Sequence, residues 1–373
     1  MNKLNFRIII YLSLLLWFAL PSVAQNELGE VNGRRAQAIN DVFRNFNRAE
    51  APGYAVGIVK NGKLVFARGF GSANLDYNIL ISKQTVFSVA SLSKQFTAAC
   101  IGILIRRGQL SLEDELAESF PEAAKYGASI RIKHLVYMTS GLKEYYRLPR
   151  PRGRSWELDY FTVQDAIAAS LNESELDFQP GTKWAYSNVN YMLLAEIVGK
   201  ASKMSFAEFA RRNIFEPLGM RNTHFNDDVT RVVRLRAVGY NLREGGGFHK
   251  HDRISPHYGG SGLHTTIEDL FVWNESFYTH ALGGAELTKL LESAMRFEHP
   301  KTNDAFGLVW GEYRGLRNLW YEGGDLGFSS YMARFPAEQF TVIVLSNLGS
   351  GDARGYAHKI LDLFIESKNR RQK

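Results

Sequence analysis

Strand-forming sequence lies at both ends of this chain of 373 residues, and helical sequence lies between them. Near the N-terminus, two β-rich runs flank the pair Asn61-Gly62, which is a strong signal for a β-hairpin between residues 54–60 and 63–70. Four further β-rich runs lie near the C-terminus, at 306–310, 316–321, 328–335 and 340–346. Strands from both ends can share one antiparallel sheet only if the middle of the chain leaves the sheet and returns to it.

Apolar residues recur at helical spacing in most of the remaining sequence. We expect an early helix near 36–46, a second helix from about 93 to 107 and a closing helix around 356–364. The long stretch from 110 to 226 is also mostly helical in its pattern. The middle of the chain should therefore form a helical region of its own.

These patterns predict an α/β protein of the α+β type, in which an antiparallel sheet is flanked by helices from both ends of the chain. An inserted all-helical lobe, 109–249, separates the two parts of an α/β lobe, 25–108 and 250–373. Clefts between lobes are preferred ligand sites, so we expect the functional site where the lobes meet.

The first 24 residues have the pattern of a signal peptide. Lys3 and Arg7 precede an apolar run, and Ser22-Val23-Ala24 forms a small-residue cleavage site. The apolar run, 8–20, is shorter than the roughly 20 residues that span a bilayer, and no later segment has an uninterrupted run of that length. We expect cleavage after Ala24, a mature chain without a transmembrane segment, and a periplasmic or secreted location.

Charge and cysteine content exclude several classes of protein. The formal charge is 45 − 38 = +7, but six cationic residues lie in the leader and the C-terminal tail, which leaves 7 − 6 = +1 for the body. Nucleic acid is therefore not predicted as a partner, because it requires basic residues concentrated on one face. Cys100 is the only cysteine, so an intramolecular disulfide and a cysteine-based zinc site are excluded. Its apolar helical neighbours indicate a buried side chain.

Ser91 and Lys94 are three residues apart at the start of the predicted helix 93–107. This spacing places hydroxyl and amine on the same helix face, so that they can share a hydrogen bond. A serine hydroxyl is a poor nucleophile at neutral pH, and a lysine can accept its proton only if desolvation or nearby positive charge lowers the pKa of the amine. A second Ser-x-x-Lys, Ser140 to Lys143, is followed by polar sequence, so the context favours Ser91.

Tyr186-Ser187-Asn188 follows a turn-forming segment, 179–182, and precedes an apolar helix. A tyrosine at such a connection could relay a proton if cationic neighbours lowered its pKa, and an asparagine could donate to a substrate carbonyl. Taken alone, the pattern is better explained by a tyrosine that packs against a helix start.

In combination, Ser91-x-x-Lys94, Tyr186-Ser-Asn188 and Glu322-Gly323-Gly324 resemble the serine β-lactamase and penicillin-binding-protein superfamily. The order and spacing are most similar to the branch that contains class C β-lactamases, D-aminopeptidases and esterases. Four other segments are similar to the usual sequences of that branch: 135–142, 180–191, 216–220 and 259–263. The resemblance covers most of the chain and implies the β-lactamase/transpeptidase-like fold.

The resemblance also implies a role for each motif residue. Ser91 would be the acylated nucleophile, and Lys94 would accept its proton. Tyr186 would protonate the leaving group and help to activate the deacylating water, and Asn188 would hold the substrate amide. The oxyanion hole would consist of the backbone N–H groups of Ser91 and of Asp325, just after the glycine pair.

The third motif departs from the family pattern, because Glu322 stands where the family has a lysine or histidine that helps to bind a substrate carboxylate. A glutamate would repel that carboxylate. We therefore expect penicillins and D-Ala-D-Ala peptides to be poor substrates unless Arg334 or the arginine-rich loop 147–154 supplies the missing charge. A second hypothesis pairs Glu322 with Lys94 or with a cationic substrate amine.

The predicted function is a secreted serine hydrolase that cleaves an amide, lactam or ester through an acyl-enzyme, with no cofactor and no metal. Its substrate would be a small molecule or peptide, with cell-wall fragments as one candidate. The alternative is a cell-envelope binding protein with little or no catalysis that retains the family cleft, a hypothesis that Glu322 motivates. A zinc site at His249, His251 and Asp252 is not favoured, because no compact third-ligand pattern follows.

Overall fold

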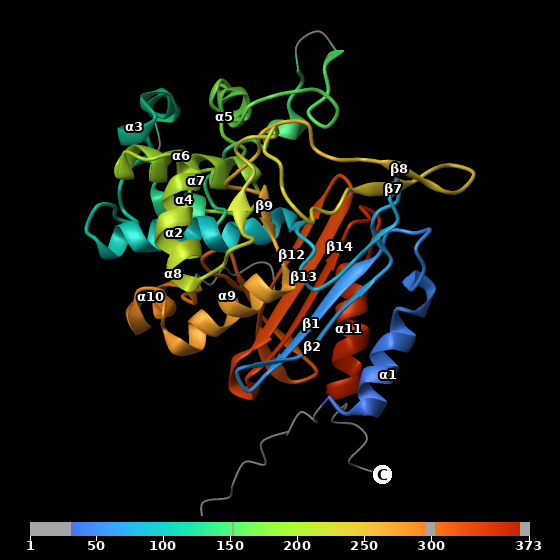
Figure 1. Cartoon of the computed structure of the whole chain (residues 1–373). Coiled ribbons are helices and arrows are strands. Elements are labelled where there is room, and N and C mark those ends of the chain that lie inside the picture. The colour runs from blue at the N-terminus through green and yellow to red at the C-terminus, as the bar shows by residue number, and fades with distance from the viewer. Residues whose placement is uncertain (1–30, 128, 151–152, 295–302, 366–373) are drawn as a thin grey trace, which may run out of the picture.

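The computed structural model describes residues 31–127, 129–150, 153–294 and 303–365. A seven-stranded antiparallel sheet forms its centre, in the order β10-β11-β12-β13-β14-β1-β2 (Figure 1). Strands from the two ends of the chain meet where Tyr54 on β1 pairs with Ser346 on β14. The strands are β1 (Tyr54–Lys60), β2 (Lys63–Phe70), β10 (Asn303–Asp304), β11 (Val309–Tyr313), β12 (Leu316–Asp325), β13 (Phe328–Phe335) and β14 (Phe340–Ser346).

Helices cover both faces of this sheet. Val342 and Val344 on β14 pack toward α1 (Gly33–Val42) and α11 (Ala353–Phe364), which lie together on one face. Ile343 and Leu345 point the other way and belong to the larger core that includes α2 (Ser93–Arg106), α9 (Ile267–Thr279) and α10 (Gly284–Leu291). Since successive side chains of a strand alternate between faces, a central strand covered on both sides must be apolar throughout, as β14 is.

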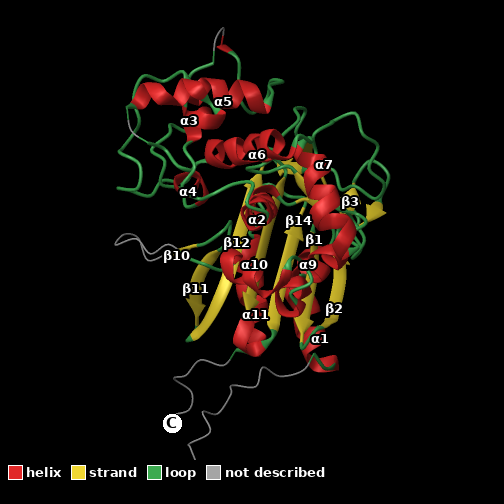
Figure 2. Ribbon diagram, turned by 90° about the vertical axis from the view of Figure 1, so that its left-hand side faces the viewer, coloured by secondary structure: helices red, strands yellow, loops and turns green. Residues whose placement is uncertain are grey.

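The helical middle of the chain gathers beyond one end of the strands, as Figure 2 shows for α3, α5 and α6. Helix α2 joins this region to the sheet, and its residues from Ser93 to Leu104 are all buried. A helix that is covered all round must be largely apolar, so each polar side chain on it requires a partner. The helices are α3 (Leu116–Ser119), α4 (Ile132–Val136), α5 (Val163–Leu171), α6 (Asn188–Ser202), α7 (Phe206–Ala210) and α8 (Glu216–Leu218).

Among the residues that the structure describes, seven short strands lie outside the central sheet. They form a pair β3-β4, a three-stranded sheet β5-β9-β6 and a pair β7-β8. Their bounds are β3 (Ser72–Asn74), β4 (Ile79–Leu80), β5 (Phe87–Ser88), β6 (His224–Phe225), β7 (Tyr240–Leu242), β8 (Phe248–Lys250) and β9 (Leu263–Thr265). β9 precedes α9, and β5 leads into a 3₁₀ turn, η2 (Ala90–Leu92), directly before α2.

The predicted fold class is confirmed, and so are the Asn61-Gly62 hairpin and the burial of Cys100. Two strand boundaries differ from the prediction. Of the run 306–310 only Val309 and Trp310 lie in a strand, because Gly307 has a positive φ of 66° in a turn between β10 and β11. β12 continues beyond residue 321 to Asp325, so Glu322-Gly323-Gly324 lies within this strand.

The predicted signal peptide, 1–24, lies outside the described residues. Within the described part of the chain, no helix has the length and apolar character that a membrane crossing requires.

Candidate active site

Ser91 lies in the tight turn between β5 and α2. Ala90, just before it, is fully buried and has a positive φ of 48°, a conformation that costs a residue other than glycine about 1–3 kcal/mol. Ser93 stabilises this turn: its hydroxyl donates to the Ala90 carbonyl at 2.5 Å and accepts from the backbone N–H of Leu263 at 2.9 Å. The backbone is thus held in a shape that presents the half-buried Ser91 side chain.

Lys94 lies one turn further along α2 and has no exposed surface. Its Nζ is 2.5 Å from the Gly260 carbonyl oxygen and 2.8 Å from Asn188 Oδ1, both of which can only accept. It is also 3.1 Å from Ser91 Oγ and 2.7 Å from Tyr186 Oη. A neutral amine has two hydrogens and one lone pair, so two donated bonds to the pure acceptors leave the lone pair for a hydroxyl proton.

Burial lowers the pKa of Lys94 to about 7, because a charged amine loses its hydration inside the protein. The carboxylates of Glu144 and Asp325 act in the opposite direction and keep this pKa from falling further. A large fraction of the amine is therefore neutral near neutral pH, which is the form that accepts a proton.

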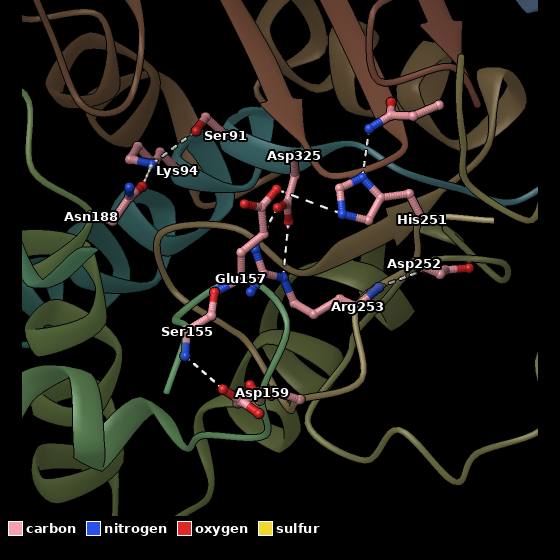
Figure 3. A network of polar contacts seen from close by, with 12 residues as sticks. Ser91, Lys94, Ser155, Glu157, Asp159, Asn188, His251, Asp252, Arg253 and Asp325 are labelled. Atoms are coloured by element: carbon pink, nitrogen blue, oxygen red, sulfur yellow. Dashed lines mark hydrogen bonds and ion pairs between the residues drawn. The ribbon is translucent and has the colours of Figure 1, made fainter. Parts of the chain in front are cut away.

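Tyr186 completes a triangle with these two side chains. Its Oη lies 2.5 Å from Ser91 Oγ, and it can donate to Asn188 Oδ1 at 3.3 Å. Burial raises the pKa of Tyr186 well above its ordinary value, so the phenol stays protonated and can only pass a proton on while receiving another. Asn188 is the first residue of α6, and its backbone N–H donates to the buried carboxylate of Glu144. Figure 3 shows Lys94 between Ser91 and Asn188.

Three glycines allow other chain segments to approach this site closely. A Cβ at Gly307 would lie 2.5 Å from the Lys94 carbonyl, and a Cβ at Gly259 would meet the Tyr191 carbonyl oxygen. A Cβ at Gly323 on β12 would lie 2.8 Å from the backbone nitrogen of Ser91. Each approach is possible only without a side chain, so Gly323 and Gly307 allow close packing against the backbone of Ser91 and Lys94, and Gly259 allows it against α6.

Glu322 does not face this site. Its side chain is 49% exposed and forms an ion pair of 3.5 Å with Arg354 on α11, on the opposite face of the sheet. The hypothesis that Glu322 pairs with Lys94 is therefore wrong, because β12 continues through the motif and successive side chains alternate. Tyr321, on the same face as Gly323, is buried near Tyr186, and both burial and that neighbour raise the pKa of its phenol.

The hairpin turn between β12 and β13 fixes the direction of two backbone N–H groups. Asp325 pairs with Phe328 across the two-residue turn 326–327, so these two residues must exchange both backbone hydrogen bonds. The N–H of Asp325 therefore points at β13, and that of Gly324 points away from it. On that side the pairing of β12 with β11 has already ended, at Trp320. Gly324 also lines the cleft beside Ser91.

A cleft of about 830 Å³ opens at Ser91, Tyr186 and Asn188. Its outer wall includes Arg150 and Arg154, so the arginine-rich loop does reach the cleft. Arg334 does not contribute to this wall. It is buried, packs over Phe277 and donates to Glu292 at 2.6 Å.

Sequence reasoning missed three charged or polar groups of the site: Glu144, Arg253 and His257. Arg253 forms an ion pair with Asp325, and His257 is a buried imidazole in the cleft wall whose pKa burial lowers to about 3. Glu144 lies two residues after the segment Ser140-Gly-Leu142, which was a usable signal, whereas Arg253 carries no local signature. Among the described residues, no group of three His, Cys, Asp or Glu side chains is arranged to hold a metal ion.

Comparison with known proteins identifies the class. Residues 39–364 match the beta-lactamase family, and the chain belongs to that family.

Two individual proteins show how similar the chain is to other members of the family. The chain is 27% identical over 302 residues to a D-aminopeptidase of Gluconobacter oxydans, covering 80% of this chain and 56% of the relative. It is 29% identical over 308 residues to Penicillin-binding protein 4* of Bacillus subtilis, covering 77% of this chain and 66% of the relative. The chain thus spans less than two thirds of the length of these relatives.

Solved structures show the same fold. An octameric penicillin-binding protein homologue from Pyrococcus abyssi has a TM-score of 0.78 at 24% identity, covering 89% of this chain and 76% of that one. A D-amino acid amidase from Ochrobactrum anthropi SV3 has a TM-score of 0.75 at 20% identity, covering 91% of this chain and 100% of the other.

The close approach of β12 predicts the effect of Gly323→Ala. The new methyl group must push β12 away from the Ser91 backbone, and overpacking of this kind costs about 1–3 kcal/mol. Urea unfolding should show this loss, while Gly33→Ala, with nothing within 4 Å of its new Cβ, should stay within about 0.5 kcal/mol of the wild type. Equal stability of both variants would contradict this account of Gly323.

Proposed function

We propose that this protein is a serine hydrolase that cleaves an amide, lactam or ester through an acyl-enzyme on Ser91. The observation that carries the proposal is the fully buried Lys94 amine, whose two hydrogens face pure acceptors while Ser91 Oγ and Tyr186 Oη lie within 3.1 Å and 2.7 Å of it. Burial that lowers a lysine pKa is the usual way to make an amine accept a serine proton at neutral pH. The hydrolase relatives support the proposal.

In the proposed acylation step, Ser91 Oγ forms a bond to the substrate carbonyl carbon. Its proton passes to the Lys94 lone pair, either directly or through the Tyr186 phenol, which gives up one proton as it receives another. The tetrahedral intermediate then breaks its bond to the leaving group, which takes the proton back along the same route through Tyr186. Water repeats the sequence on the acyl-enzyme, and Ser91 regains its proton.

We assign the oxyanion hole to the backbone N–H groups of Ser91 and Gly324. This assignment replaces Asp325, because the two-residue turn directs the Asp325 N–H at β13 and the Gly324 N–H away from it. A donor of this kind contributes about 3 kcal/mol of transition-state stabilisation. Asn188 remains the proposed partner of the substrate amide.

We further propose that the cleft lies where the helical lobe, 109–249, meets the α/β lobe. Tyr186 and Asn188 come from the first, and Ser91, Lys94 and Gly324 come from the second. The signal-peptide pattern of residues 1–24 supports a periplasmic or secreted location.

For the substrate, we propose D-amino acid amides or peptides without a carboxylate next to the scissile bond. The names of two relatives, a D-aminopeptidase and a D-amino acid amidase, support this class. The site itself supports it too: the side chains that β12 directs toward Ser91 include the neutral Tyr321 and no lysine, and Arg334 is engaged elsewhere. Glu322, which motivated the alternative of a binding protein with little or no catalysis, faces Arg354 and argues for neither function.

The first test is the intact mass of the protein after exposure to a fluorophosphonate. The wild type should gain one adduct, because the buried amine activates Ser91, and Ser91→Ala should gain none. Lys94→Met should lower the labelling rate at least about 100-fold. A folded wild type without an adduct, or an adduct that persists in Ser91→Ala, would refute the proposed function.

The rate of labelling should depend on pH through Lys94. Because the pKa of Lys94 is about 7, protonation below that pH removes the acceptor, and the rate should fall about tenfold for each pH unit on the acidic side. The Glu144 carboxylate raises this pKa, so Glu144→Gln should move the acidic limb to lower pH. A rate that stays constant between about pH 5.5 and 8 contradicts the role of Lys94.

The substrate proposal predicts a difference between two matched peptides, D-phenylalanyl-D-alanine and its C-terminal amide. Because β12 offers no cation, a carboxylate next to the scissile bond loses its hydration and gains no partner on that strand, so kcat/KM should be at least about tenfold higher for the amide. Equal or faster cleavage of the acid contradicts the prediction, and loss of that activity in Arg150→Gln would then assign the cation to the arginine-rich loop.

A further inference from the structure

The turn between β12 and β13, 326–327, packs closely against a neighbouring segment of the chain. Leu326 has a positive φ of 31°, which is a strained conformation for a residue with a side chain. The second turn residue, Gly327, is packed so closely that a Cβ there would lie 2.5 Å from the His251 carbonyl oxygen and would also meet the Tyr240 nitrogen. A strained turn keeps its shape only when its surroundings hold it, and here the surroundings are residues 239–253.

The same segment contributes an ion pair to the end of β12. Arg253 Nε donates to Asp325 Oδ2 at 3.1 Å, and a second guanidinium nitrogen donates to Oδ1, so the pair is bidentate (Figure 3). The two side chains are only 17% and 14% exposed. The residue before Arg253, Asp252, is itself held by Arg236 at 2.8 and 2.9 Å. The Arg253–Asp325 pair thus connects the segment to the hairpin, and the Arg236–Asp252 pair holds the neighbouring residue of the segment.

This pair lies beside the reacting groups. Arg253 and Asp325 both line the cleft with Ser91, and the Asp325 side chain follows directly on Gly324 in the chain. Without Arg253, the Asp325 carboxylate would be a nearly buried charge without its bidentate partner, and it would move toward water and take the end of β12 with it.

We propose that the Arg253–Asp325 ion pair is a positioning clamp that holds the β12–β13 turn so that the Gly324 N–H faces the carbonyl oxygen of the substrate. Arg253 and Asp325 are positioning residues in this scheme and touch no reacting atom. The inference rests on the proposed serine hydrolase function, since it concerns the second donor of the oxyanion hole. It predicts that loss of the pair weakens binding of the transition state more than binding of the substrate.

The test compares Arg253→Met with Arg334→Met, because Arg334 also forms a buried ion pair with a glutamate but lies outside the cleft lining. With D-phenylalanine p-nitroanilide as substrate, Arg253→Met should lower kcat about 10- to 100-fold with KM changed less than threefold. The affinity for phenylboronic acid, which forms a tetrahedral adduct with a serine, should fall by the same factor as kcat. Arg334→Met should lower the melting temperature and leave kcat and boronate affinity unchanged.

Arg253→Lys should recover part of kcat, because it restores the charge without the bidentate geometry. If Arg253→Met changes only the melting temperature, or raises KM for substrates with a carboxylate while kcat stays constant, the clamp is refuted, and the second result would make Arg253 a substrate-binding residue.

Hydrogen–deuterium exchange separates this inference from the proposed function, because it requires no activity. In Arg253→Met, amides of residues 321–330 should exchange at least about tenfold faster than in the wild type. In Arg334→Met, amides of residues 321–325 should exchange at the wild-type rate. Unchanged exchange in Arg253→Met overturns the clamp even if the wild type is an active hydrolase. Absence of a fluorophosphonate adduct on the wild type refutes the hydrolase instead, and the exchange result still decides whether the pair holds the turn.

Discussion

The amine of Lys94 has no contact with solvent, and much of the structure around the cleft keeps it buried. A lysine can be buried without a carboxylate partner only if its hydrogens meet acceptors and its charge can be given up. The Gly260 carbonyl and Asn188 Oδ1 supply the acceptors, from two segments far apart in the sequence. Helix α2, which is covered on all sides, supplies the dry surroundings. Helix α2, the start of α6 and the segment that contains Gly260 therefore have to meet at this one nitrogen.

The sheet contributes to the site through the alternation of one strand. The pairing of β12 with β11 ends at Trp320, whereas its pairing with β13 continues to Asp325, beside η2. Along this stretch, odd-numbered residues face Ser91 and its neighbours, and even-numbered side chains face α11 or solvent. The chemical character of the cleft is set by this register: a shift of one residue would replace the phenol of Tyr321 with the carboxylate of Glu322.

Much of this arrangement could be predicted from the sequence. The Asn61-Gly62 hairpin and the runs at 328–335 and 340–346 carry strong local signals, and the structure has strands at those positions. Ser91, Lys94, Tyr186 and Asn188 were identified by their motifs, and the structure brings them together. The orientation of Glu322 was not predictable in this way, because it depends on where β12 ends. Arg253 and Asp325 are 72 residues apart and meet only through the path of the segment 239–253, for which the sequence offers no periodic signal.

The three glycines at the centre of the site have a consequence for how the protein can diversify. Gly307 and Gly323 bring two separate segments against the backbone of Lys94 and Ser91, and Gly259 brings a third segment against the backbone of α6 at Tyr191. The position of the reacting groups is thus set by main chain against main chain. Side chains on the outer wall of the cleft, such as Arg150 and Trp156, are not part of this contact. Substitution at the outer wall therefore changes the shape and charge of the cleft without disturbing this backbone packing, so in the proposed hydrolase the choice of substrate can diverge in evolution while the reacting groups stay in place.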